Sequence, residues 1–168
     1  VTITDNIGCI TNESYTLTDP PPFLPTINSS DITCFGNNDG IIEVINEPSS
    51  TSYLWSNTAT SSSITNLATG NYSVDVIDIN NCVFDTVIQI SEPAELNVTC
   101  SANDISCNGD DNGNISFSIS GGITNYIIDM PPFNDTLFNG LTTYTKDSLS
   151  QGVYNYSVID ANGCFYSD

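Results

Sequence analysis

Six cysteines are the residues of this 168-residue chain that most clearly offer a defined chemistry. They do not form a usual zinc site, because the sequence has no Cys-x-x-Cys pair and no histidine. The chain contains a single basic residue and is rich in Asn and Thr, a composition in which cysteines favour an oxidising, extracellular setting. We therefore expect these cysteines to be disulfide staples, not redox or catalytic groups.

One acidic turn has oxygen-bearing side chains at alternate positions. Asp110, Asn112 and Asn114 are spaced like the first ligands of an EF-type calcium loop. The bidentate glutamate that closes such a loop is missing, since Phe117 to Ser120 follow. Runs of Asn, Asp and Gly also cap hairpins through their own side chains, without a metal. Plain turn chemistry is the favoured interpretation, with weak calcium binding as the alternative and no other cofactor expected.

Aromatic and acidic residues give two further hypotheses. Tyr53, Trp55, Tyr126 and Phe133 could stack on sugars, but Tyr53 and Trp55 share one face of a strand by their spacing, which favours core packing. Glycoside hydrolysis needs two carboxyl groups in one cleft, whereas the carboxylates here are scattered over turns. Without histidine there is no Ser-His-Asp triad. No catalytic residue is predicted, and the chain is not expected to be an enzyme.

Charge excludes two classes of partner. The formal net charge is -19, from one cation, Lys146, and twenty carboxylates. A nucleic-acid-binding protein needs a basic surface to displace counterions, and an anionic membrane would repel this chain. No apolar run is long enough to cross a bilayer, so direct membrane insertion is not expected either. Hydrophobic residues nevertheless reach 39 %, with eight Tyr and seven Phe, which is enough to build cores.

The positions of these residues follow an internal repeat. The segment 34–42 recurs as 107–115, an offset of 73 positions, and later residues of the unit recur at an offset of 82. The second unit therefore carries a nine-residue insertion. The pairs at the longer offset share residue type: Leu67 and Leu149, Gly70 and Gly152, Tyr72 and Tyr154, Val76 and Val158, Asp78 and Asp160, and Cys82 and Cys164.

The repeat predicts how the chain divides. Residues 1–20 are interpreted as the C-terminal part of a preceding repeat, because 5–9 matches 78–82 and 160–164. Residues 21–93 form the first repeat. Residues 94–168 form the second repeat, with an insertion around 130–146 and without its last strand. The chain is interpreted as a window on a longer tandem array, and a strand-exchange polymer is the alternative.

Short alternating stretches of β-branched and aromatic residues indicate β-structure throughout a unit. Such stretches include 72–76 and 83–90, and clusters of Gly, Asn, Asp and Ser separate them. Sustained helical spacing is absent. Six or seven short strands in about 73 residues predict an all-β chain of tandem, small immunoglobulin-like antiparallel β-sandwich repeats.

These motifs resemble the SprB repeat. The resemblance rests on Cys-x-Gly-x-x-Asp-Gly at 34–40, Tyr-Leu-Trp-Ser-Asn at 53–57, Leu-Ala-Thr-Gly-Asn-Tyr at 67–72 and the Asp-x-Asn-Asn-Cys ending at Cys82. Ile128 stands in place of Trp55, and Asn81 in place of the usual Gly. The resemblance implies a very large surface adhesin of gliding Bacteroidota, exported by a type IX system and displayed in filaments.

The resemblance also implies a cysteine pairing. Each unit has an opening and a closing cysteine, which gives Cys34–Cys82 and Cys107–Cys164 as the simplest pairs. In an immunoglobulin topology these positions lie at opposite ends of the sandwich, so a bridge between units, Cys34–Cys164, is the alternative. Cys100 has no counterpart, since Ile27 occupies its place in the first unit. It is either a free thiol or one half of a junction bridge.

Glycosylation follows from the same resemblance. Thr86, Thr136 and Ser148 each follow Asp and precede an aliphatic residue, the O-glycan pattern of Bacteroidota. The function we expect is a non-enzymatic structural segment of an extracellular, cell-surface adhesin filament that mediates attachment or gliding. Its expected partners are neighbouring repeats and surface polysaccharide. The alternatives are a subunit of a polymerised extracellular fibre or sheath, and a calcium- or carbohydrate-binding β-sandwich module.

Overall fold

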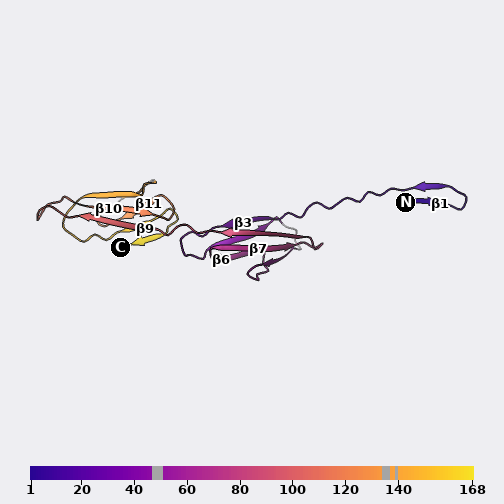
Figure 1. The fold of residues 1–168 in the computed structure, drawn as a ribbon, viewed down its shortest axis with the longest axis horizontal. Helices are drawn as coiled ribbons and strands as arrows, with labels where there is room; N and C mark the ends of the chain where they lie inside the picture. Colours follow the sequence, from indigo (N-terminus) through magenta and orange to yellow (C-terminus); the bar gives the residue numbers. More distant parts are fainter. Residues whose placement is uncertain (47–50, 134–136, 139) are drawn as a thin grey trace.

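The computed structural model describes residues 1–46, 51–133, 137–138 and 140–168. The described chain contains strands and no helix, which confirms the all-β class. Three parts follow one another along the long axis: an N-terminal hairpin, the first unit and the second unit (Figure 1). None of the described residues forms a helix long and apolar enough to cross a membrane.

The first unit consists of two three-stranded antiparallel sheets. In one sheet the spatial order is β3-β4-β6, and in the other it is β5-β7-β8. The first sheet contains β3 (Thr26–Ser30), β4 (Gly40–Ile45) and β6 (Ser63–Leu67). The second contains β5 (Ser52–Trp55), β7 (Gly70–Ile77) and β8 (Val83–Ile90).

Alternation along these strands places one core between the two sheets. On β4, Ile42 and Val44 are buried while the residues between them are exposed, and Val74 and Val76 do the same on β7. Trp55 joins this cluster from β5, and its indole nitrogen donates to the carbonyl of Ser61 at 2.8 Å. Each large apolar side chain buried in this way contributes about 1.5–3 kcal/mol.

The second unit repeats this arrangement with one strand more. Its sheets have the orders β13-β10-β9 and β12-β11-β14-β15. The first contains β9 (Asn97–Asn103), β10 (Gly113–Ser120) and β13 (Thr143–Leu149). The second contains β11 (Tyr126–Asp129), β12 (Leu137–Phe138), β14 (Ser157–Ile159) and β15 (Phe165–Ser167). Two packed sheets per unit support a β-sandwich repeat, and an immunoglobulin-like topology stays a prediction.

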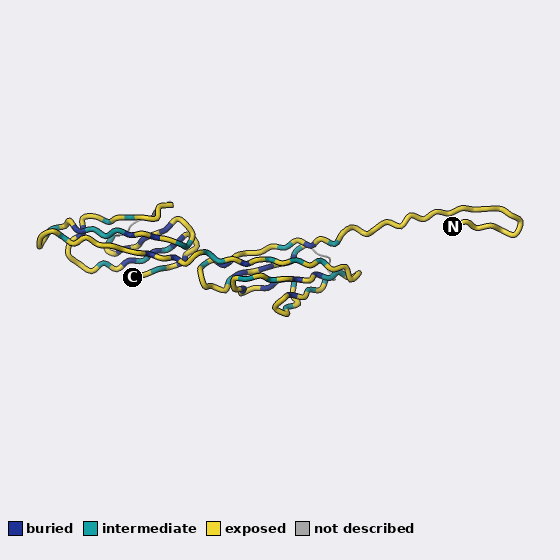
Figure 2. Tube along the Cα trace, in the orientation of Figure 1, coloured by how far each residue is buried: buried dark blue, intermediate teal, exposed yellow. Residues whose placement is uncertain are grey.

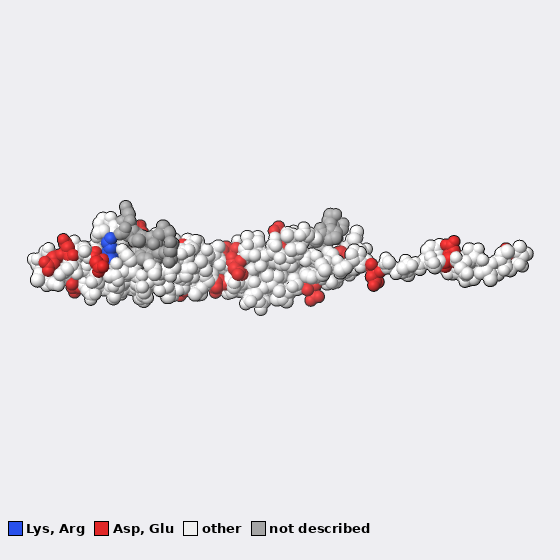
Figure 3. All heavy atoms as spheres, turned by 90° about the horizontal axis from the view of Figure 1, so that it is seen from above, with Lys and Arg blue, Asp and Glu red and all other residues white. Residues whose placement is uncertain are grey.

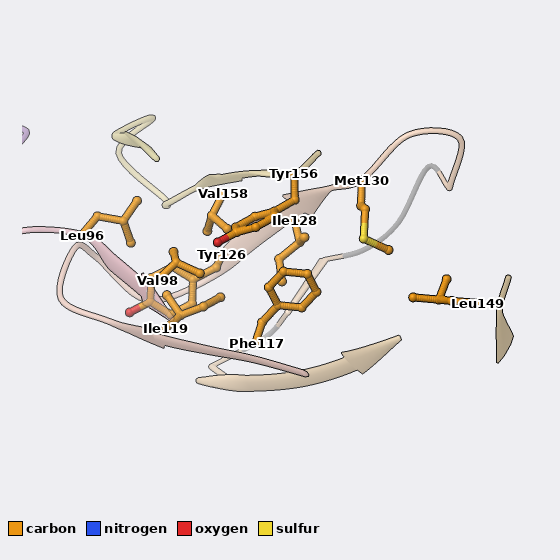
Figure 4. Packing of buried hydrophobic residues seen from close by; sticks show 10 residues of the cluster. All are labelled: Leu96, Val98, Phe117, Ile119, Tyr126, Ile128, Met130, Leu149, Tyr156 and Val158. Carbon is orange, nitrogen blue, oxygen red and sulfur yellow. The ribbon is translucent and has the colours of Figure 1, made fainter. Parts of the chain in front are cut away.

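The two cores place their aromatic bulk differently. Ile128 occupies the position of Trp55 and is equally buried. Phe117 and Tyr156, which replace Val44 and Val74 at the repeat offsets, pack edge-to-face with ring centroids 4.8 Å apart, and all three residues lie in one cluster (Figure 4). Loss of the indole is therefore compensated by two rings across the sandwich, which keeps the interior filled.

The expectation that the second unit lacks its last strand is wrong. β15 pairs with β14 in the antiparallel register by which β8 pairs with β7. Three residues after Cys164 suffice for pairing because the turn at 160–164 connects β14 directly to β15 and places the two strands side by side. The insertion adds β12, which pairs with β11. Residues 134–136 and 139 of the insertion lie outside the described part of the chain.

The N-terminal hairpin joins β1 (Thr2–Thr4) to β2 (Ile10–Asn12) and stands apart from both units. All of its residues are exposed, and the chain from there to the first unit is extended (Figures 1 and 2). Its assignment to a preceding repeat stays a prediction. Carboxylates are spread along the molecule, and the single cation lies in the second unit (Figure 3).

Candidate functional site

The same five-residue closing turn occurs three times, at Asp5–Cys9, Asp78–Cys82 and Asp160–Cys164. In each copy one aspartate oxygen accepts hydrogen bonds from two backbone amides, those two and four positions later, at 2.8–3.0 Å. The fourth residue is left-handed: Gly8, Asn81 and Gly163 have φ of 89°, 62° and 84°. Asn81 replaces the usual Gly because Asn also tolerates this conformation.

A second motif, the opening loop, occurs twice, at 33–39 and 106–112. In the first unit Asp39 accepts hydrogen bonds from the amide and hydroxyl of Thr33. In the second unit Asn112 accepts from the amide of Ser106 at 2.9 Å and donates to its hydroxyl at 3.0 Å. The two loops thus close through the same two positions, although the residue types differ.

The opening loop of the first unit and the last closing turn meet between the units. Cys34 is joined to Cys164 by a disulfide, with 5.6 Å between the Cα atoms. Beside it, the Asn162 side chain donates to the carbonyl of Thr33 at 2.9 Å. We call this contact, together with linker residues 91–95, the junction. It is the candidate functional site.

The pairings Cys34–Cys82 and Cys107–Cys164 are wrong, because Cys34 and Cys164 are bonded to each other and Cys82 and Cys107 are free. Strand length explains this. Eight-residue β8 begins just after Cys82 and ends at Ile90, and the next residue, Ser91, accepts a hydrogen bond from Ile32, directly before the opening loop. The length of β8 therefore puts Cys82 about 26 Å from that loop. A disulfide tolerates only about 7 Å between Cα atoms. The bridge between units was the alternative that the sequence left open.

Two acidic side chains fix the linker to the opening loop and to the residues just before that loop. Asp31 accepts from the amide of Ser91 at 2.9 Å and from its hydroxyl at 2.7 Å, and Glu92 accepts from the amide of Gly36 at 2.9 Å. These bonds from Ser91, the backbone amide first, hold the pKa of Asp31 below its ordinary value. Hydrogen bonds from Thr33, the hydroxyl first, lower the pKa of Asp39 in the same way.

The other side of the junction is built by the second unit. Asp160 is buried, and its second oxygen accepts from the amide of Ile123 at 2.8 Å. Gly122 donates to the carbonyl of Ala94 at 2.8 Å, so the linker lies against this turn. A Cβ on Gly121 would come within 1.8 Å of the Glu95 carbonyl oxygen. A Cβ on Gly122 would come within 2.7 Å of an Asp160 carboxylate oxygen. Glycine is therefore required at 121 by the close approach of the linker and at 122 by the side chain of Asp160.

Calcium binding at Asp110, Asn112 and Asn114 gains no support. The side-chain oxygens of Asn112 and Asn114 accept hydrogen bonds from Ser106 and Asn103. Within the described residues no three acidic, cysteine or histidine side chains gather in a group that could hold a metal ion. Calcium at this turn therefore stays an untested prediction.

Two of the aromatic candidates for sugar binding lie in the cores. Trp55 and Tyr126 are each 2 % exposed, so neither offers a ring face to solvent. Phe133 is half-buried, with the Lys146 ammonium 4.4 Å from its ring centroid. Tyr53 is half-buried against the first core. No open aromatic platform is built from these four residues.

The three glycosylation candidates differ in access. Ser148 is exposed on β13. Thr86 is half-buried, on the face of β8 where Phe84 and Ile88 pack against the core, so a glycan there would meet the sandwich. Thr136 lies outside the described residues. Of the two candidates that the structure describes, Ser148 is the accessible one, and its modification stays a prediction.

Four described cysteines are free and exposed: Cys9, Cys82, Cys100 and Cys107. Partial desolvation raises the pKa of the Cys82 thiol, and the nearby Asp78 carboxylate raises it further by disfavouring the thiolate. Burial raises the pKa of Tyr156, whose hydroxyl also interacts with the Cys100 side chain. Because Cys100 is free and lies on β9, it takes no part in the disulfide of the junction.

Comparison with known families places a match over β9, β10 and the start of β11. Residues 99–128 match the SprB repeat family. This match includes the second opening loop and confirms the resemblance over that segment. The SprB repeat is a structural repeat, not known as enzymatic, and occurs in surface adhesins. No curated protein matches the chain.

Sequence reasoning missed the polar groups that fix the junction. The sequence gives no predicted role to Asn162 or Asp31, although Asn162 lies in the closing turn and Asp31 lies two residues before the opening loop. The signal was their recurrence: Asn80 stands 82 positions before Asn162, and Asp104 stands 73 positions after Asp31. A polar residue repeated beside a repeated cysteine indicates a shared contact as well as a turn.

Proposed function

We propose that this chain is a structural segment of a cell-surface adhesin filament that mediates attachment or gliding. The observation that carries the proposal is the junction: two units, one of them matching the SprB repeat, are covalently joined end to end. A disulfide between successive units transmits tension between them without relying on the cores to resist it.

The position of this bond determines the path of a pulling force. Tension applied at the two ends enters the covalent loop at Cys34 and leaves it at Cys164, which are 130 residues apart in sequence. Nearly all of both cores therefore lies inside a closed loop that force cannot extend. If the disulfide were broken and this segment unfolded under tension, it would extend to about 440 Å. The intact disulfide prevents that extension.

The surface fits the same role. Carboxylates are distributed along the whole length of the molecule, so neighbouring filaments repel one another at low ionic strength (Figure 3). Contacts with surface polysaccharide would each be weak, and many units in one filament would multiply their effect through avidity. Export by a type IX system and O-glycosylation belong to the same proposal.

The test is surface labelling of intact cells that express the protein, with an antibody against the second unit. We expect labelling before lysis, its loss in a strain without the gene, and weaker attachment under flow in that strain. A membrane-impermeant reductant should also weaken attachment under flow. An epitope that becomes accessible only after lysis would contradict the proposal.

A second candidate function, a subunit of a polymerised extracellular fibre, is favoured by one observation. Leu17, which stands 73 positions before Ile90, is 96 % exposed, whereas Ile90 is fully buried. An exposed segment of this sequence could pair as the missing strand of a sandwich in a second copy. Sedimentation separates the two candidates: an elongated monomer supports the adhesin segment, and concentration-dependent polymers support the fibre.

A further inference from the structure

Cys107 lies in an opening loop that reproduces the environment of Cys34. The carbonyl of each cysteine accepts from the amide three residues later at 3.0 Å, and the intervening Gly36 and Gly109 are left-handed, with φ of 76° and 91°. The polar pair that closes each loop is also equivalent. Cys107 therefore lies in the same local structure as Cys34. It is at the end of the second unit that is far from the Cys34–Cys164 disulfide, and it is free.

Cys82 lies in a closing turn that reproduces the environment of Cys164. Its amide donates to Asp78 at 2.8 Å, and that of Cys164 donates to Asp160 at 2.8 Å. The backbone pair between the aspartate and the cysteine measures 3.0 Å in both turns. Cys82 is exposed and free, whereas Cys164 is bonded and only 9 % exposed.

An independent feature marks the far end of the second unit as a second junction face. A groove of about 530 Å³ is lined there by Asp104, Ile105, Cys107, Gly113, Leu149 and Gly152, among others. The equivalent residues of the first unit surround Ile90 and Ser91: Asp31 binds Ser91, and Gly40 and Gly70 lie against Ile90. Ile32, in the first unit where the linker is present, is 4 % exposed, whereas its equivalent Ile105 in the second unit is half-buried. The groove is therefore lined by the residues equivalent to those that contact Ile90 and Ser91 in the first unit, and it is open to receive the same two residues of a following linker.

We propose that Cys107 forms a disulfide with the closing-turn cysteine of a following SprB-like unit, and Cys82 with the opening-loop cysteine of a preceding one. This inference rests on the proposed function, because it requires further units of the same kind in the array. The partner is defined by its chemistry: an Asp-x-Asn-Gly-Cys turn beside a linker of the type Ile-Ser-Glu-Pro, as at 160–164 and 90–93.

The chemistry is an oxidation of two thiols. One S–S bond forms as two S–H bonds break, and two protons and two electrons leave. The oxidant is a disulfide compound, either oxidised glutathione or the disulfide form of a thiol oxidoreductase, which is itself reduced to two thiols. The extracellular setting expected of the chain supplies such oxidants.

The consequence is a staggered covalent ladder. Each unit would carry two bridges, one from its opening loop to the next unit and one from its closing turn to the unit before. Successive loops of the ladder overlap, so each core lies inside covalent loops. This differs from intra-unit bridging, which would leave every junction to non-covalent contacts alone.

The experiment uses the full chain with residues 83–168 repeated after Cys164. Cys82 and Cys164 occupy the same position in their closing turns, so residue 83 can follow Cys164 as it follows Cys82. The added segment then supplies a copy of β8 and of the linker, followed by a third unit. The protein is refolded in a glutathione buffer, free thiols are alkylated, and linked peptides are mapped by mass spectrometry without reduction. We expect Cys107 linked to the second copy of Cys164, together with Cys34 linked to the first copy.

Two matched variants sharpen the test. Replacing the second copy of Cys164 by serine should make Cys107 fully alkylated while the Cys34 bridge persists. Cys100→Ser should change neither bridge. The Cys34 bridge also reports folding within the same molecule. In the protein that keeps both copies of Cys164, an alkylated Cys107 beside an intact Cys34 bridge would therefore overturn the inference.

Two other outcomes would also overturn it. Cys107 linked to the first copy of Cys164 would restore intra-unit pairing, and loss of the Cys34 bridge itself would remove the template. Because the readout is a bond in a purified chain, either failure leaves the surface role standing. Conversely, finding the protein inside cells would contradict the surface role but would not change the result for the Cys107 disulfide in the purified chain.

Discussion

Replacing Cys34 and Cys164 together by serine is expected to destabilise the second unit more than any other change at the junction. With the first unit folded, Ser91 is held beside Asp31, so unfolding the second unit alone leaves a closed loop from about residue 91 to Cys164. A disulfide that closes a loop of about 70 residues lowers the entropy of the unfolded chain and so stabilises the folded second unit by about 4 kcal/mol.

That free energy converts to a large thermal shift. For a domain of 60–100 residues, 1 kcal/mol corresponds to about 4–8 °C, so the melting temperature of the second unit should fall by about 15–30 °C. Differential scanning calorimetry of the oxidised protein and the double variant measures this directly.

Cys82→Ser is the matched control, because the free and exposed Cys82 occupies the same kind of turn. It should leave the melting temperature unchanged. A fall below about 4 °C in the double variant would mean that the bridge constrains little of the unfolded chain. A fall in the control as large as that in the double variant would refute the assigned connectivity.

Three further predictions concern the groups around the bridge. Gly121→Ala should destabilise the second unit by about 2 kcal/mol or more in urea unfolding, because its Cβ would strike the Glu95 carbonyl. Gly140→Ala, with the same φ of 73° and open space around it, isolates the conformational cost, and an equal loss in both would contradict the contact. Asp160→Ala should cost about 2–4 kcal/mol in the same assay, because three backbone amides lose their acceptor in a buried turn, and a loss below about 1 kcal/mol would mean that water replaces the carboxylate. The pKa of Asp31 is lower folded than unfolded, so its contribution to stability is full above the unfolded value near 3.8 and is lost as pH falls through the folded value. Asp31→Asn should therefore flatten the loss of stability in acid, and an unchanged acid titration of the melting temperature would count against the Ser91 contact.

Much of the local structure could be predicted because it depends on residues close in sequence. Alternation at 72–76 predicted a strand, and the structure has β7 there, with the alternating residues Val74 and Val76 buried. The Asp-to-Cys pentapeptide recurs three times in the sequence and adopts the same turn each time, because the bonds that form this turn lie within five residues. Such features need no knowledge of the partner strand.

Compensation between distant positions could not be predicted from one sequence. Ile128 looked like a departure from the repeat, and only the packing shows that Phe117 and Tyr156 supply the missing volume. Thr86 and Ser148 match the same glycosylation pattern, but Thr86 is half-buried on the side of β8 that faces the core. The short β15 was also missed, because pairing of three residues depends on the hairpin that precedes them.

The sequence by itself determined the β class, the repeat, the alternation that builds two cores and the turns that carry five of the six cysteines, because all of these follow from side-chain type and spacing along the chain. The tertiary structure decided which cysteines bond. A disulfide needs its two Cα atoms within about 7 Å, and the eight-residue strand β8 separates Cys82 from Cys34 while end-to-end stacking of the units brings Cys164 to 5.6 Å. Distance in space, set by strand length and by stacking, therefore selected a bridge between units over a bridge within one.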